Sequence, residues 1–112
     1  MFIAVYEFEI KDGAEDRFRA AWLEVTKVIY QHCGSYGSRL HTSDKPNVMI
    51  GYAQWPTREQ WEKEHEIKSA IYHTAFADMH SCLVQMNTVY QLEVCDDYLQ
   101  SALAMEVQQE AY

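Results

Sequence analysis

Hydrophobic side chains alternate with other residues along residues 2–10, and this period of two predicts a β-strand with one strongly buried face. Glu7 and Glu9 mark the more polar face of that strand. From residue 14 the hydrophobic positions recur at steps of three and four, which predicts an amphipathic helix. Gly34 is expected to end this helix, because glycine readily adopts the left-handed conformation that follows a last helical turn.

Two more strands are predicted at residues 35–43 and 48–55. The segment between them contains Pro46 and has the composition of a turn, so the two strands are expected to form a hairpin with a longer loop. Pro56 ends the later strand, because proline has no N–H to donate to a strand ladder.

A helix is expected to begin at Thr57, whose hydroxyl can cap the first turn, and to run to about residue 65. Gln60 lies three residues later and can bond back to the Thr57 N–H, which would complete a capping box. A further helix is predicted from about residue 68 to residue 84. Its apolar stripe consists of Ile71, Ala75, Met79 and Leu83, with Tyr72 and Phe76 beside it.

Alternation returns along residues 86–94 and predicts a fourth strand. The order strand, helix, strand, strand, helix, strand is that of a ferredoxin-like βαββαβ fold, an α+β architecture with a four-stranded antiparallel sheet. Two helices can cover only one face of such a sheet. Apolar residues occur on both faces of the first, third and fourth strands, so the uncovered face is expected to pack on a second copy and form a homodimer.

The chain has 112 residues, enough for one domain with one core. Residues 1–95 account for the predicted fold, and residues 96–112 form a C-terminal extension. This extension is expected either to form a short amphipathic helix, using Tyr98, Ala102 and Met105, or to fray.

The net charge of −8 comes from 17 acidic and 9 basic residues, and the basic residues form no cluster. This composition argues against binding to nucleic acid or to an anionic membrane surface. No apolar run approaches the roughly 20 residues of a membrane span. A neutral or apolar small molecule is therefore the favoured partner.

The compartment is expected to be cytoplasmic. The N-terminal segment has neither a basic leader nor a small-residue cleavage site of the kind found in secretory signals. The cysteines Cys33, Cys82 and Cys95 are odd in number and have no C-x-x-C spacing, which indicates reduced, buried or half-buried thiols.

Common catalytic motifs are missing from the sequence. No two of the five histidines have the i, i+4 spacing of a helical metal site, so no metal is expected. There is no glycine-rich phosphate loop and no G-x-S-x-G nucleophile motif.

The join between the third strand and the next helix is the candidate site. Side chains at the end of a strand and in the first turns of the following helix usually face one cavity, so Trp55 and Trp61 are candidates for the wall of an apolar pocket. His65 lies four residues beyond Trp61, on the same face of the expected helix, where it could donate a hydrogen bond or carry a proton. The alternative is that His65 is an exposed member of a charged run. Trp22, in the middle of a helical stripe, is interpreted as a core residue.

Four other residues are candidates for holding a polar group of a ligand. Tyr6, Tyr52 and Tyr72 could bond to it through their hydroxyls, although a packed tyrosine more commonly bonds to backbone. Arg39 is the only formally charged residue in the second strand. It could bind an acidic group, but a salt bridge within or between subunits is the favoured interpretation.

Three segments in this order, FIAVYEFEIKDGAEDRFRAAW, GSYGSRLH and IGYAQWPTREQWEKEH, resemble the antibiotic biosynthesis monooxygenase (ABM) family over about residues 1–95. The resemblance implies a dimeric α+β barrel built from ferredoxin-like subunits. It also implies oxygenation of a small aromatic or quinol-type substrate without metal or flavin, because a bound phenolate can itself pass an electron to dioxygen.

The resemblance further implies roles for particular residues. His65 resembles a histidine often found in the family's second helical region, with His73 as a second possible match, and Trp61 falls near the pocket aromatics. Tyr6 stands at about the position where oxygenating relatives supply an asparagine. Two alternatives follow from the same resemblance: a non-catalytic, ligand-binding or stress-related dimer, and a haem-binding or haem-degrading variant with His65 or His73 as axial ligand.

Overall fold

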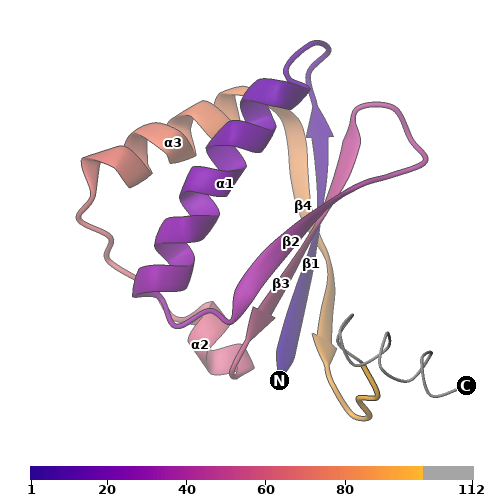
Figure 1. The fold of residues 1–112 in the computed structure, drawn as a ribbon, viewed down its shortest axis with the longest axis vertical. Coiled ribbons are helices and arrows are strands. Elements are labelled where there is room, and N and C mark those ends of the chain that lie inside the picture. The colour runs from indigo at the N-terminus through magenta and orange to yellow at the C-terminus, as the bar shows by residue number, and fades with distance from the viewer. Residues whose placement is uncertain (100–112) are drawn as a thin grey trace, which may run out of the picture.

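The computed structural model describes residues 1–99 and has the predicted ferredoxin-like α+β fold (Figure 1). Its elements are β1 (Phe2–Ile10), α1 (Glu15–His32), β2 (Gly37–Thr42), β3 (Val48–Trp55), α2 (Arg58–Glu62), α3 (Ala70–Ser81) and β4 (Leu83–Glu93). The four strands form one antiparallel sheet in the order β2-β3-β1-β4. Helices α1 and α3 lie together on one face of this sheet, as Figure 1 shows.

The covered face of the sheet carries two separate groups of buried side chains. One group surrounds Phe8 and Phe18, whose ring centroids are 5.0 Å apart, and it includes Met49 and Met79. The other group lies at the opposite end of β1 and consists of Phe2, Ala4, Cys33, Ala53 and Trp55. The strand register explains the separation, because Phe8 pairs with Met49 at one end of the sheet and Phe2 with Trp55 at the other.

Helix α2 is shorter than predicted. Its start is confirmed, since the Thr57 hydroxyl accepts a hydrogen bond from the Gln60 N–H at 3.1 Å. The predicted capping box is wrong. The Gln60 side chain instead donates a hydrogen bond to the carbonyl of Cys33, the residue that follows the last residue of α1, at 2.8 Å. The helix ends at Glu62, and the extended chain beyond it brings Ile67 onto the second group of buried residues.

The α3–β4 region also departs from the prediction. Helix α3 ends at Ser81 and β4 begins at Leu83, each about three residues earlier than expected. Ile71 was predicted to lie on the buried stripe, but its side chain is 70% exposed. The rest of the predicted stripe is confirmed: Met79 is buried, and Ala75 and Leu83 pack against the same group of core residues, as does Tyr72.

A β-bulge divides β4 into two halves. Tyr90 pairs with Val5 whereas Thr88 pairs with Tyr6, so Val89 is an extra residue and the expected unbroken alternation is wrong. Because side chains directly opposite each other share a face, Thr88 lies on the helix-covered face and Tyr90 on the uncovered face.

The uncovered face retains an apolar surface. It includes Tyr90 and Leu92, which are 63% and 43% exposed, beside Val5 and the buried Ile3. Residues 96–99 form no helix or strand, and the rest of the helix expected over 96–112 lies outside the described residues.

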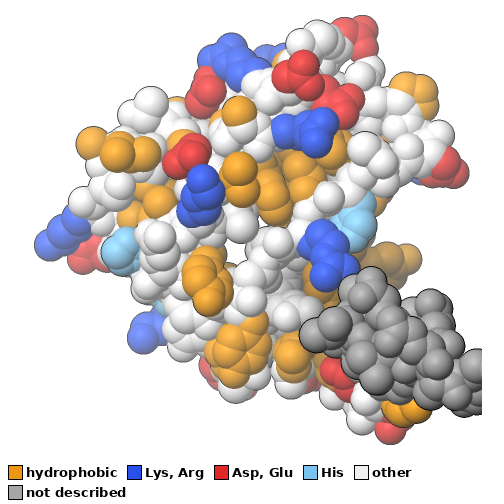
Figure 2. Space-filling view, in the orientation of Figure 1, with side chains coloured by type: hydrophobic (Ala, Val, Ile, Leu, Met, Phe, Trp, Pro, Cys, Tyr) orange, Lys and Arg blue, Asp and Glu red, His pale blue; other side chains and the backbone are white. Residues whose placement is uncertain are grey.

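The burial of two cysteines and the distribution of surface charge agree with the predictions made from the sequence. Cys33 and Cys82 are buried free thiols, whereas Cys95 is exposed rather than half-buried. In the view of Figure 2, acidic and basic side chains are interspersed and the basic ones form no stripe. Within residues 1–99, no helix has the length and apolar character that crossing a membrane requires.

Phe18 is completely buried in the first group, so truncation there should be costly. We expect Phe18→Ala to lower the free energy of unfolding by about 3–5 kcal/mol, through lost burial and the cavity left behind. Leu23→Ala, on the same helix at 46% exposure, is the matched control and should cost less than about 1 kcal/mol. Urea unfolding followed by circular dichroism, at one protein concentration, measures both. Equal losses in the two variants would contradict this description of the core.

Candidate functional site

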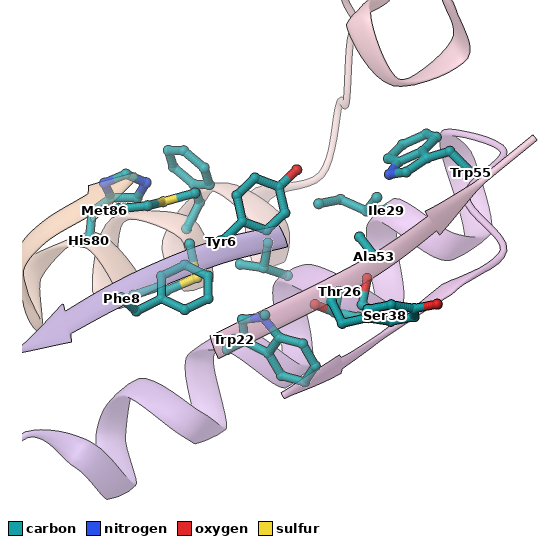
Figure 3. Close-up of a pocket in the computed structure, with 15 residues that line it drawn as sticks. Tyr6, Phe8, Trp22, Thr26, Ile29, Ser38, Ala53, Trp55, His80 and Met86 are labelled. Atoms are coloured by element: carbon teal, nitrogen blue, oxygen red, sulfur yellow. The ribbon is translucent and has the colours of Figure 1, made fainter. Parts of the chain in front are cut away.

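A cavity of about 340 Å³ lies between the helix layer and the sheet (Figure 3). Most of its walls are apolar, and they come from both helices α1 and α3 and from all four strands. The lining residues are Tyr6, Phe8, Trp22, Val25, Thr26, Ile29, Ser38, Gly51, Tyr52, Ala53, Trp55, Phe76, Met79, His80 and Met86. Its volume falls within the range of small-molecule sites, and apolar walls with few polar groups are typical of them.

The cavity exists where the sheet carries small side chains. Ala4 pairs with Ala53, and Tyr6 pairs with Gly51, so the middle of the covered face lacks bulk from β3. A Cβ atom at Gly51 would lie 2.8 Å from the Phe8 ring, too close for the ring to stay in place. Gly51 therefore allows Phe8 to lie over β3 and to form part of the cavity wall.

Tyr6 is a polar residue in the wall of this cavity. Its hydroxyl oxygen accepts a hydrogen bond from the Trp61 indole N–H at 2.7 Å. Burial raises the pKa of Tyr6 and outweighs the bond from Trp61, which lowers it. Tyr6 is therefore a neutral phenol near pH 7, and its own O–H remains available to donate.

Trp55 supplies a second donor. Its side chain is only 6% exposed, and its indole N–H is buried with no hydrogen-bond partner among the described residues. In Figure 3 the indole nitrogen lies on the side of the ring that faces Ile29 and the cavity. A buried donor without a partner costs roughly 1–3 kcal/mol, so an acceptor atom of a bound molecule would recover that energy.

The structure divides the predicted site residues into two sets. Tyr6, Tyr52 and Trp55 line the cavity, although the pairing of Tyr52 with Val5 directs its side chain to the uncovered face of the sheet. The other five predicted residues do not line it: Arg39, Trp61, His65, Tyr72 and His73.

Trp61 and His65 each contact a residue that lines the cavity: Trp61 contacts Tyr6, and His65 contacts Trp55. They do not share a helical face as predicted, because α2 ends at Glu62. The His65 ring stacks on Trp55 with centroids 6.1 Å apart, and its Nε2 lies 3.1 Å from the Gln60 carbonyl. His65 is half-buried in this packing, so it is not the exposed residue of the alternative interpretation.

The remaining three residues have other surroundings. Tyr72 is half-buried against the first group of core residues, and burial raises its pKa. His73 is exposed, with its Nε2 2.7 Å from the Ile67 carbonyl. Arg39 is exposed, and within residues 1–99 of one chain it forms no salt bridge with a carboxylate; a salt bridge between subunits stays a prediction.

Sequence reasoning missed part of the cavity wall. Trp22 was interpreted as core; it is half-buried and packs against the first group of core residues, and it also lines the cavity. Phe76 and His80, one helical turn apart on α3, also line it, with ring centroids 4.4 Å apart. Their i, i+4 spacing was the signal in the sequence that could have identified this pair.

The two histidines proposed as haem ligands do not face the cavity. These residues, His65 and His73, each have a ring nitrogen engaged with a backbone carbonyl, and neither lines the cavity. Across residues 1–99 there is also no group of three or more metal-binding side chains.

The sequence profile of the antibiotic biosynthesis monooxygenase family matches residues 1–70, which is more than half of the chain. The chain belongs to this family. No curated protein matches it.

Solved structures of similar fold have low sequence identity to the chain. One is a protein from Bordetella bronchiseptica assigned as an antibiotic biosynthesis monooxygenase, with 17% identity and a TM-score of 0.68 over 84% of this chain and 96% of that one. Another is SnoaB, a cofactor-independent oxygenase from Streptomyces nogalater, with 12% identity and a TM-score of 0.66 over 88% and 97%. At these identities the structures establish the shared fold.

The raised pKa of Tyr6 predicts how stability depends on pH. The neutral phenol is favoured in the folded state, so its contribution is complete below the ordinary tyrosine pKa of about 10 and is lost as pH rises through the higher folded value. Tyr6→Phe lacks this loss. We therefore expect the wild type to lose stability relative to Tyr6→Phe above about pH 10.

Urea unfolding of both proteins from about pH 8 to pH 11 measures this difference. Tyr30→Phe removes an exposed hydroxyl from α1 and controls for the loss of a tyrosine. Parallel curves for wild type and Tyr6→Phe over this range would contradict the burial of the Tyr6 hydroxyl.

Proposed function

We propose that this protein is a cofactor-independent monooxygenase that acts on a small aromatic quinol or phenol. The observation that carries the proposal is an apolar cavity whose wall includes Trp55, a buried indole donor with no hydrogen-bond partner among residues 1–99. Family membership and the fold shared with SnoaB support the same class of reaction.

The reaction suits such a cavity because the substrate supplies its own electrons. A quinol that reacts with one dioxygen gives a hydroxyquinone and one water: one oxygen atom enters the product and the other leaves as water. The substrate provides all four electrons, and dioxygen is the oxidant. The protein needs to bind the substrate away from water, favour its anion, and stabilise the negative charge that passes to oxygen.

In this proposal Tyr6 and Trp55 act directly on the substrate. Both donate hydrogen bonds to a substrate oxygen as negative charge develops there, in an apolar site where such bonds are stronger than in water. Trp61 and His65 act through them: Trp61 by donating to the Tyr6 hydroxyl, and His65 by stacking on the Trp55 ring. Tyr72, His73 and Arg39 are assigned no contact with the substrate, since none of them lines the cavity.

We further propose that two copies pair through the uncovered sheet face. Each unpaired chain exposes Tyr90 and Leu92 there, on β4, on the side of the sheet opposite the two helices. Exposed apolar surface of this kind is stabilised by a self-complementary contact.

The oxygenase proposal is tested by mixing the purified full chain with naphthohydroquinone and isotopically labelled dioxygen. We expect a hydroxyquinone that carries one labelled oxygen atom, formed faster than in buffer alone. Trp55→Phe keeps an aromatic ring but removes the donor, and should lower kcat/KM roughly a hundredfold. Tyr36→Phe, an exposed site outside the cavity, is the control and should retain the wild-type rate.

Two results would count against this proposal. Binding of the quinol without labelled product would support the non-catalytic ligand-binding protein instead. An unchanged rate in Trp55→Phe would show that the buried indole donor has no role in the reaction.

The dimer is tested by sedimentation of the full chain at micromolar concentration. We expect the wild type at twice the 13.1 kDa chain mass and Leu92→Asp as a folded monomer, because a charge would be buried in the interface. Ile71→Asp, on the helix side of the molecule, should remain dimeric. A monomeric wild type, or a dimer lost only in Ile71→Asp, would overturn the pairing through the sheet.

A further inference from the structure

Among the described residues that line the cavity, His80 is the one with a basic side chain. The fifteen lining residues include no aspartate, glutamate, lysine, arginine or cysteine. Their hydroxyls, on Tyr6, Thr26, Ser38 and Tyr52, are weak bases, and the indoles only donate. Among the fifteen lining residues, His80 is therefore the side chain that can accept a proton released by a molecule in this cavity.

The surroundings of His80 leave its imidazole free to act. Within residues 1–99, no hydrogen bond is formed to either ring nitrogen of His80, whereas His41, His65 and His73 each have a ring nitrogen beside a backbone carbonyl. Its ring packs against Phe76 at a centroid separation of 4.4 Å, which holds it at the last turn of α3. His80 is also exposed, so it can exchange protons with bulk water.

The polar groups of the cavity lie at separate ends. In Figure 3, His80 and Met86 lie together at one end, Trp55 lies at the other, and Tyr6 is between them. A ligand that fills the cavity thus meets the buried indole donor at one end and an imidazole at the end between α3 and β4.

We propose that His80 is the proton acceptor of this site, for a phenolic ligand whose hydroxyl lies at the α3–β4 end of the cavity. The O–H bond of the ligand breaks and its electron pair stays on oxygen. The proton forms an N–H bond on the imidazole, and the resulting imidazolium stabilises the adjacent phenolate. Exposure to water then allows the imidazolium to return its proton to solvent.

This inference rests on the proposed function for its ligand class and adds the residue that produces the reactive anion. The matched variants are His80→Gln and His32→Gln. Both histidines are exposed and lie in the last turn of a helix, but only His80 lines the cavity. Glutamine keeps the polarity and approximate length of histidine but accepts no proton at neutral pH.

The first measurement is the absorbance of naphthol bound to the full chain without dioxygen, since naphthol and its anion have different spectra. We expect the anion spectrum with wild type and His32→Gln, and the neutral spectrum with His80→Gln at an affinity within about threefold. The second is turnover of naphthohydroquinone, which His80→Gln should slow roughly a hundredfold, the low end for loss of a general base.

Each outcome separates the two proposals. Anion formation and turnover unchanged in His80→Gln would overturn the role of His80 and leave the oxygenase intact. Anion formation that depends on His80, without labelled product, would support His80 and overturn the oxygenase. A wild type that binds neither probe would overturn both.

Discussion

The contact between Gly51 and the Phe8 ring is the constraint on which the cavity depends. No side chain larger than hydrogen fits at Gly51 while the ring keeps its place, since a Cβ atom would come within 2.8 Å of it. The neighbouring pair of Ala4 and Ala53 adds little volume. The two helices therefore pack on bulky side chains only at the ends of the sheet, which separates the core into two groups with a hollow between them. A protein interior normally closes such a space, so its retention here is informative.

The order of elements followed from the sequence because burial periodicity is a local property. The strand of residues 2–10 and the helix that follows it needed only the change of period from two to about three and a half. The missed features depend on contacts between distant segments. The early end of α2 reflects Gln60 bonding to Cys33 and Ile67 packing on the far end of the sheet. The bulge at Val89 depends on how β4 pairs with β1, which the alternation of β4 alone does not contain.

The candidate site was also predictable only where it depends on local sequence. Trp55 was identified because residues where a strand meets the next helix usually face one cavity, and Tyr6 because its hydroxyl could hold a polar group of a ligand. Both line the cavity. His65 was expected on one helical face with Trp61, and that expectation failed when the helix ended at Glu62. His80 was dismissed with the other histidines as a metal ligand, although its spacing from Phe76 placed it on the helix face toward the sheet.

The electrostatics of the cavity favour a neutral molecule that becomes an anion after it has entered. A charged ligand would lose its hydration among walls whose described residues include no carboxylate, lysine or arginine. A neutral phenol avoids that cost. Once it loses its proton, the anion is held by donors that are already oriented, because Trp61 orients the Tyr6 hydroxyl and packing fixes the Trp55 ring. Donors fixed in advance need no reorganisation during the reaction, which is why a cavity with few polar groups can stabilise the charge that forms in it.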